Sequence, residues 1–154
     1  MNHNDVLRRL RYMFDFDDSQ MMDVFAQADH AVTREQVCNW LKQDDDAEFV
    51  KIKDREMAVF LNGLINLRRG RRDGPQPEPE NRLTNNMVLM KLRIALNMQS
   101  DDVQSLLADT GLNFSKHEIS ALFRKPGHKH YRECEDQLLR NVLKGLQTRL
   151  RQHA

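Results

Sequence analysis

The chain has 154 residues, of which 40% are hydrophobic and 31% are charged, and its formal net charge is +1. This composition is typical of a folded soluble protein and excludes extensive disorder. No apolar run approaches the roughly 20 residues that span a bilayer, and the N-terminus lacks the apolar stretch of a secretory signal. We therefore expect a cytoplasmic protein without membrane association, in which Cys38 and Cys134 are reduced.

The sequence reads twice, because residues 4–72 align without a gap with residues 86–154 at a constant offset of 82. Between the copies, prolines and glycines exclude a helix and favour an extended linker. We predict an all-α fold, a tandem duplication of a four-helix unit packed with pseudo-twofold symmetry. The first repeat should span 1–70, the linker 71–84 and the second repeat 85–154.

The first two helices of each copy are predicted from apolar residues at helical spacing. In the first helix, Asn4 and Asn86 are the expected N-caps. The second helix should follow a cap at Asp17 or Asp18 in one copy and at Ser100 in the other. Gly111 is expected to end the latter helix in a left-handed conformation.

The third helix has the strongest start signal. Thr33 with Gln36, and Ser115 with Glu118, are capping boxes at equivalent positions. Apolar residues flank each box at the two positions of a hydrophobic staple, namely Val32 with Val37 and Phe114 with Ile119. A helix is therefore predicted to begin after each box and to end before residues 44–46 or 126–127.

The fourth helix is predicted to begin at Asp54 or Asp136 as its cap and to bury a stripe at i, i+3, i+4 and i+7. Gly63 and Gly145 lie inside these helices, where glycine costs about 1 kcal/mol relative to alanine. Their recurrence predicts a close approach of another helix. A second recurring pair, Arg11/Arg93 with Asp54/Asp136, predicts an ion pair between the first helix and the start of the fourth.

The segments VLRRLRYMFDFDD, FLNGLINLRRG and VLMKLRIALNM resemble the YehS-like family of small bacterial proteins, whose duplicated domain has no assigned function. The resemblance covers the whole chain. It implies a cytosolic, mostly helical protein and transfers no catalytic residue. The second copy departs from the first by having Pro126-Gly-His128 where the first has the acidic triplet Asp44–Asp46.

The segment from 122 to 134 of the second copy suggests a surface that binds polyanions. We call residues 124–132 the basic loop, and its cations are Arg124, Lys125, Lys129 and Arg132. Phosphates would bind these cations, while Tyr131 or a histidine stacks on a base. The alternative is a solvated loop in which Tyr131, equivalent to Phe49, belongs to the core.

The preceding residues, 103–123, read as a helix, a glycine turn and a helix, which is typical of a helix-turn-helix. The turn is two residues longer than usual. If this third helix entered a groove, its exposed readers would be Lys116, His117, Ser120 and Arg124. An ordinary helical corner is the alternative, because the same geometry occurs in many folds that bind nothing.

The first copy has an acidic loop at the equivalent place, formed by Asp44–Asp46 and Glu48. These carboxylates would repel phosphate, so any nucleic-acid site should be confined to the second copy. Alternatively, the acidic loop of one molecule would meet the basic loop of another and build oligomers.

Other chemistry has little support in the sequence. His128, His130 and Cys134 have donor atoms suited to a metal, but their spacing matches no known closed site, and we assign no metal or cofactor. Phosphate-binding glycine loops and nucleophile motifs are absent, so no residue is assigned as catalytic. We predict a non-enzymatic binding or regulatory protein whose partner is RNA or DNA, or alternatively a protein-interaction adaptor or self-associating scaffold.

Overall fold

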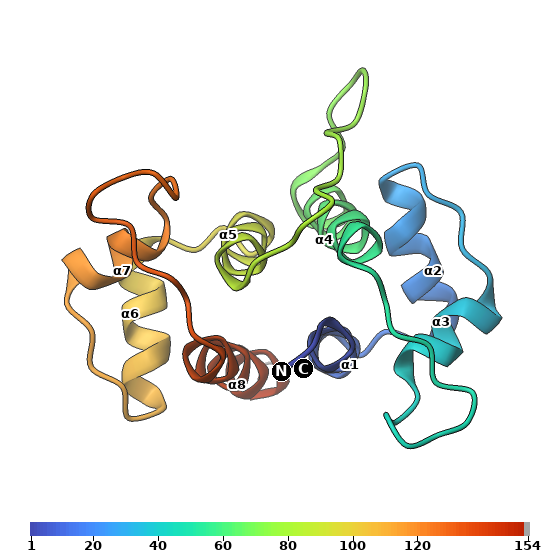
Figure 1. Cartoon of the computed structure of the whole chain (residues 1–154), viewed down its shortest axis with the longest axis horizontal. Helices are drawn as coiled ribbons and strands as arrows, with labels where there is room; N and C mark the ends of the chain where they lie inside the picture. Colours follow the sequence, from blue (N-terminus) through green and yellow to red (C-terminus); the bar gives the residue numbers. More distant parts are fainter. Residues whose placement is uncertain (153–154) are drawn as a thin grey trace. The chain divides into compact units, whose positions relative to one another are not determined.

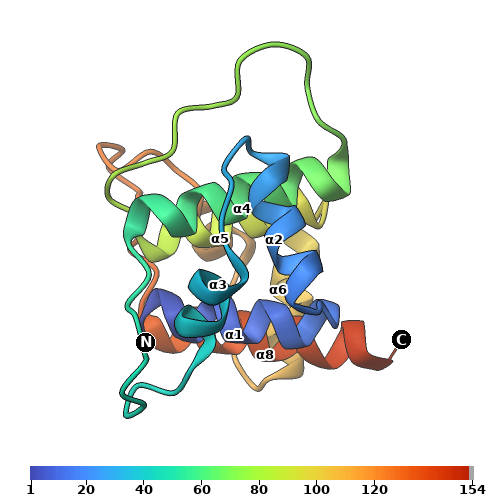
Figure 2. The same cartoon turned by 90° about the vertical axis from the view of Figure 1, so that its right-hand side faces the viewer.

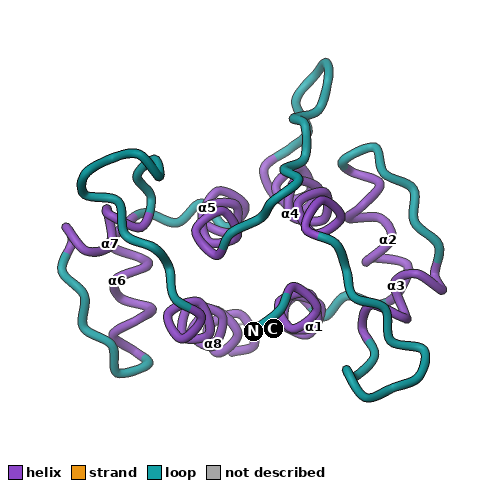
Figure 3. Tube along the Cα trace, in the orientation of Figure 1, coloured by secondary structure: helices purple, strands orange, loops and turns teal. Residues whose placement is uncertain are grey.

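The computed structural model describes residues 1–152, and the last two residues of the predicted second repeat lie outside this part. Within residues 1–152, all regular secondary structure is α-helical (Figure 3). In chain order the helices are α1 (His3–Phe14), α2 (Asp18–Gln27), α3 (Arg34–Leu41), α4 (Asp54–Arg69), α5 (Asn85–Ala95), α6 (Ser100–Asp109), α7 (Lys116–Leu122) and α8 (Asp136–Gln152). The all-α prediction is confirmed, and no helix in the described range is long and apolar enough to cross a membrane.

The chain divides into two compact units, 1–83 and 84–154, each containing four helices of the duplication. Equivalent side chains occupy equivalent places in the two units. Leu10 and Leu92 are fully buried, and Trp40 and Leu122 are 2% and 1% exposed. The apolar stripe predicted for α4 and α8 is buried in both, at Met57, Phe60, Leu61, Leu64, Leu139, Val142, Leu143 and Leu146.

The segment predicted as a linker belongs with the first unit up to residue 83. The Arg55 guanidinium on α4 donates to Glu78 (2.6 Å) and to the Pro79 carbonyl (3.1 Å). Leu83 is 5% exposed, and its N–H donates to Asp54 at 2.8 Å. Thr84 then caps α5, because its hydroxyl accepts the N–H of Met87 at 3.3 Å.

Figure 2 shows α2 lying across α4 in the first unit. The crossing depends on Gly63, where a Cβ atom would lie 1.8 Å from the carbonyl oxygen of Val24. At the equivalent crossing of α6 and α8, a Cβ on Gly145 would lie 2.9 Å from Cδ2 of Leu106 and 3.1 Å from its carbonyl oxygen. The predicted close approach is confirmed in both units.

Both capping boxes of the third helix are confirmed. The Thr33 hydroxyl accepts the N–H of Gln36 at 3.1 Å, and Gln36 accepts the N–H of Thr33 at 2.8 Å. Ser115 and Glu118 make the same two bonds at 3.2 and 3.0 Å. Gly111 has a φ of +88° after α6, as its predicted left-handed role requires.

Some predicted caps of the other helices are wrong. Asp17 caps α2, but Gln99 rather than Ser100 occupies the cap position of α6. The fourth helix begins at Asp54 with Lys53 as its cap residue, so Asp54 is the first helical residue. Each error is a shift of one residue along the chain.

The predicted ion pair between Arg11/Arg93 and Asp54/Asp136 is also wrong. Asp54 instead contacts Nε2 of His3 at 3.1 Å, and Asp136 accepts a hydrogen bond from Nδ2 of Asn85 at 2.8 Å. His3 and Asn85 are equivalent residues, so the first helix is joined to the start of the fourth through them. Arg11 lies about two turns further along α1 than His3. There its guanidinium is 3.4 Å from the carboxylate of Asp18.

Candidate functional site

The basic loop of the second unit leaves the end of α7 and turns back along that helix before it reaches α8 (Figure 1). Between the loop and α7 lies a cleft of about 620 Å³, which we call the basic cleft. Its lining residues are His117, Glu118, Ala121, Arg124, Lys129, His130, Tyr131 and Arg132. Four of the seven residues predicted from the sequence line this cleft, namely His117, Arg124, Lys129 and Arg132.

A buried asparagine on α5, Asn86, holds the loop in place. Its Nδ2 donates to the carbonyl oxygens of Leu122 (3.0 Å) and Arg132 (2.8 Å). Its Oδ1 accepts the N–H of Cys134 at 2.8 Å. Both ends of the loop are therefore joined to one side chain that is 8% exposed.

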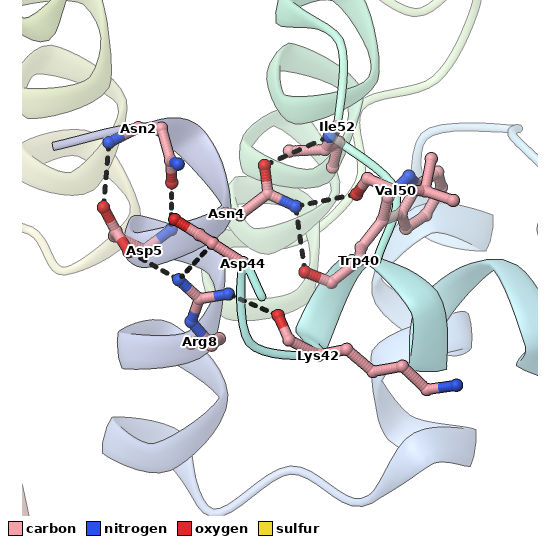
Figure 4. A network of polar contacts seen from close by, with 9 residues as sticks. All are labelled: Asn2, Asn4, Asp5, Arg8, Trp40, Lys42, Asp44, Val50 and Ile52. Atoms are coloured by element: carbon pink, nitrogen blue, oxygen red, sulfur yellow. Dashed lines mark hydrogen bonds and ion pairs between the residues drawn. The ribbon is translucent and has the colours of Figure 1, made fainter. Parts of the chain in front are cut away.

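Figure 4 shows the same arrangement around Asn4 in the first unit. Nδ2 of Asn4 donates to the carbonyls of Trp40 (2.9 Å) and Val50 (3.0 Å), and Oδ1 accepts the N–H of Ile52 at 3.2 Å. The prediction that Asn4 and Asn86 are N-caps is therefore wrong. Asn2 and Thr84 cap these helices, and the two asparagines bind the loops instead.

The two loops also share their internal backbone bonds. In the first unit, Asp46 N–H donates to the Gln43 carbonyl at 3.0 Å, and in the second unit His128 N–H donates to the Lys125 carbonyl at 2.9 Å. Each loop is then joined to its preceding helix by one equivalent bond, Val50 to Asn39 at 3.1 Å and Arg132 to Ala121 at 3.0 Å. The backbone course of the loop is therefore independent of the charges that it carries.

The cations of the basic loop differ in how strongly they are neutralised. The charged ends of Arg124, Lys125 and Lys129 are exposed and have no hydrogen-bond or ion-pair partner within residues 1–152. By contrast, Arg132 donates to Glu118 at 3.1 Å, and its guanidinium lies 4.9 Å from the ring centroid of Phe114. Three cations are therefore available to an anion, and Arg132 helps to form the wall.

The remaining predicted readers on α7 contribute less. Lys116 is paired with Asp101 at 3.4 Å, and Ser120 is half-buried and outside the cleft lining. Ile119 and Leu122 face the core, whereas Phe123 is only half-buried beneath the guanidinium of Arg93, which lies 4.5 Å from its ring centroid. The cleft thus depends more on the loop than on the outer face of α7.

Two residues of the cleft, Glu118 and Ala121, were not expected as parts of a site. Bonds from Ser115 hold the pKa of Glu118 below its ordinary value, with a smaller contribution from Arg132. The sequence predicts Glu118 only as part of the capping box. Its second contact, with Arg132, could not be predicted because the two residues are 14 positions apart.

The aromatic residue of the cleft, Tyr131, is half-buried, and desolvation raises the pKa of its hydroxyl.

The potential metal ligands are not brought together. The thiol of Cys134 is buried and donates to the Glu135 carbonyl at 3.7 Å, whereas His128 and His130 are exposed with their rings 5.6 Å apart. Among residues 1–152, no three side chains of His, Cys, Asp or Glu form a cluster that could hold a metal.

The first unit has a cleft of about 400 Å³ at the equivalent place. Glu35, Gln36, Asn39 and Val50 line it where His117, Glu118, Ala121 and Arg132 line the basic cleft. The acidic loop follows the same course beside it, and Asp44 lies 3.4 Å from Arg8 on α1 (Figure 4). Lys51 and Lys53 also line the first cleft and balance its carboxylates, so the duplication provides one cleft with a different set of charges in each unit.

Comparison with known proteins is consistent with this duplicated architecture. Residues 3–70 and 85–152 each match the model of a family described as "Protein of unknown function (DUF1456)". The chain is also 40% identical over 150 residues to "Uncharacterized protein YehS" of Escherichia coli (strain K12), an alignment that covers 97% of this chain and 96% of the relative. No solved structure matches it. The chain therefore belongs to the DUF1456 family and contains two copies of its domain.

Proposed function

We propose that this protein acts in the cytoplasm by binding single-stranded nucleic acid, RNA or DNA, in the basic cleft, without catalysing a reaction. The observation that carries the proposal is the set of three unpaired cations, Arg124, Lys125 and Lys129, beside a cleft of about 620 Å³. Phosphates bind such cations by releasing counterions, and this term supplies most non-specific affinity.

The cleft favours a single strand over a duplex. Tyr131 and His130 line it, and aromatic rings in a cleft stack on unpaired bases. A duplex would have to be read from the outer face of α7, which has only 7 residues. That face presents the carboxylate of Glu118, and its Lys116 is already paired with Asp101.

The proposal is tested by fluorescence anisotropy with labelled single strands of about 20 nucleotides at about 50 mM salt. Arg124, Lys125 and Lys129 are changed together to Ala. Because all three are exposed and their charged ends have no protein partner in the described residues, the variant should fold normally and bind about tenfold or more weakly.

A matched control removes three exposed cations of the first unit instead, by changing Arg69, Arg72 and Arg82 to Ala. This control has the same net charge as the test variant and should bind within about twofold of the unaltered protein. Equal losses in the two variants, or no loss in the first, would reject the basic cleft as the binding site. A duplex competitor of the same length should displace the strand poorly.

A further inference from the structure

The exposed surfaces around the two clefts are inverted in charge at equivalent positions. Two pairs of exposed residues place a lysine in the first unit and a glutamate in the second, Lys51/Glu133 and Lys53/Glu135, and two pairs place a glutamate in the first unit and a histidine in the second, Glu35/His117 and Glu48/His130. At the loop tips, Asp44–Asp46 of the first unit face outward, where the second unit has Lys125 and Lys129 on either side of its turn. We call these surfaces the acidic face (residues 35 and 44–53) and the basic face (residues 117 and 125–135).

The two loops that carry these different charges have the same backbone geometry. Asn4 and Asn86 bind the two loops through the same three hydrogen bonds, and the turns within the loops match. Lys51 and Lys53 therefore stand at the same places as Glu133 and Glu135, and the carboxylates of one loop tip lie at the same turn as the lysines of the other. When such surfaces meet about a local twofold axis that runs along the loops, the acidic tip faces the basic tip, and Lys51 and Lys53 lie opposite Glu133 and Glu135.

A second observation also points to a partner for the acidic face. Val50 lies on this face with 47% of its surface exposed, although its neighbour Ile52 is 1% exposed. The residues equivalent to Phe49 and Val50 on the basic face are Tyr131, which is half-buried, and Arg132, which is exposed. An apolar contact among complementary charges is the usual composition of a protein interface.

We propose that the acidic face of one copy docks on the basic face of a second copy and so covers the basic cleft. Each molecule has one face of each kind, so the contact is heterologous and can extend into a series or close into a ring. The two loops form a small area, which implies weak association that depends on salt. The association needs no nucleic acid, whereas its consequence, masking of the cleft, rests on the proposed function.

The test is sedimentation velocity of the full chain at concentrations between about 10 μM and 1 mM, in about 50 mM and about 500 mM salt. The acidic variant carries Lys125→Glu and Lys129→Glu, and the basic variant carries Asp45→Lys and Glu48→Lys. None of these four side chains stabilises the fold through a salt bridge, since all are exposed and without ion pairs in residues 1–152. The unaltered protein should show a mean sedimentation coefficient that rises with concentration only at low salt.

Each variant alone should lose self-association by about tenfold or more, because like charges then oppose each other. Mixing the two variants, or combining all four substitutions in one chain, should restore it. A protein that stays monomeric at every concentration, or a mixture that does not recover, would overturn the proposal. The chain with all four substitutions separates the two proposals, since it should self-associate and still bind single strands weakly.

Discussion

Two buried asparagines, Asn4 and Asn86, hold the loops that distinguish the two repeats. Each amide donates to two carbonyls and accepts one N–H, all from residues 36 to 48 positions away in the chain. Because a buried backbone group without a partner is costly, no apolar residue could replace either amide without loss. The same side chain thereby maintains an acidic loop in one unit and a basic loop in the other.

We predict that Asn4→Ala destabilises the first unit by about 2–4 kcal/mol, because Trp40 and Val50 carbonyls and the Ile52 N–H lose their partner. Urea unfolding followed by fluorescence measures this directly, since Trp40 is the single tryptophan and lies beside Asn4. Asn39→Ala is the matched control, because the second unit has Ala121 at that place, and it should change stability by less than about 0.5 kcal/mol. Equal effects would contradict the role of Asn4.

A second prediction concerns the buried thiol of Cys134. Desolvation raises its pKa to about 12 in the folded protein, above the ordinary value of 9.0. The unfolded chain therefore releases this proton first, and stability that is fully present below pH 9 is lost as the pH rises toward 12. The slope is about 1.4 kcal/mol per pH unit. Urea unfolding at several alkaline pH values should show less of this loss in Cys134→Val, which places an apolar residue where the first unit has Ile52.

The role of the asparagines could not be predicted from the sequence, for a physical reason. An asparagine just before an apolar helix satisfies the local chemistry of a cap, and that chemistry predicts the wrong role for Asn4. Its actual partners lie on α3 and in the loop that follows, and neither composition nor periodicity indicates that they meet. The ion pair of Arg132 with Glu118 could not be predicted either, because nothing in the sequence indicates that these two residues meet.

At the scale of the helices, the crossings of α2 with α4 and of α6 with α8 are equivalent but not equally tight. A Cβ on Gly63 would meet a backbone oxygen at 1.8 Å, whereas one on Gly145 would first meet the end of the Leu106 side chain at 2.9 Å. A leucine methyl group can move, but a helical carbonyl cannot move without displacing α2. The first unit therefore depends more strongly on its glycine.

We predict that Gly63→Ala destabilises the protein by more than about 3 kcal/mol, despite the roughly 1 kcal/mol by which alanine favours a helix. Gly145→Ala should cost about 1–2 kcal/mol at most. Thermal unfolding followed by circular dichroism compares the two, with Gly127→Ala as the control because nothing lies within 4 Å of its added Cβ. Similar effects at positions 63 and 145 would show that the crossings are equally tolerant.

The starts of the third helices and the buried stripes were predictable because their signals are local. Thr33 and Ser115 bind groups only three residues away, and the stripe of α4 repeats with the helical period. The position of the basic cleft was predictable in part, since the cations are adjacent in sequence. The sequence could not predict which cations are unpaired. Lys116 pairs with Asp101 and Arg132 with Glu118, and these partners are 15 and 14 residues away in the chain.

For the whole molecule, a formal net charge of +1 conceals two units of different character. Residues 1–83 contain 13 basic and 16 acidic residues, whereas residues 84–154 contain 11 and 7. Net charge therefore predicts neither attraction nor repulsion of a polyanion. The proposed binding of nucleic acid therefore relies on the local set of cations around the basic cleft.

This localisation predicts a specific dependence on salt. For a single strand, the logarithm of the association constant falls with the logarithm of the salt concentration by about 0.7 for each phosphate that is neutralised. The three unpaired cations of the basic cleft, Arg124, Lys125 and Lys129, should therefore contribute about 2 to this slope. Titrations between about 50 and 200 mM salt should show that contribution lost in the triple alanine variant and kept in the variant of Arg69, Arg72 and Arg82. Because both variants lower the net charge equally, an equal change in slope would mean that the binding follows total charge and not the cleft.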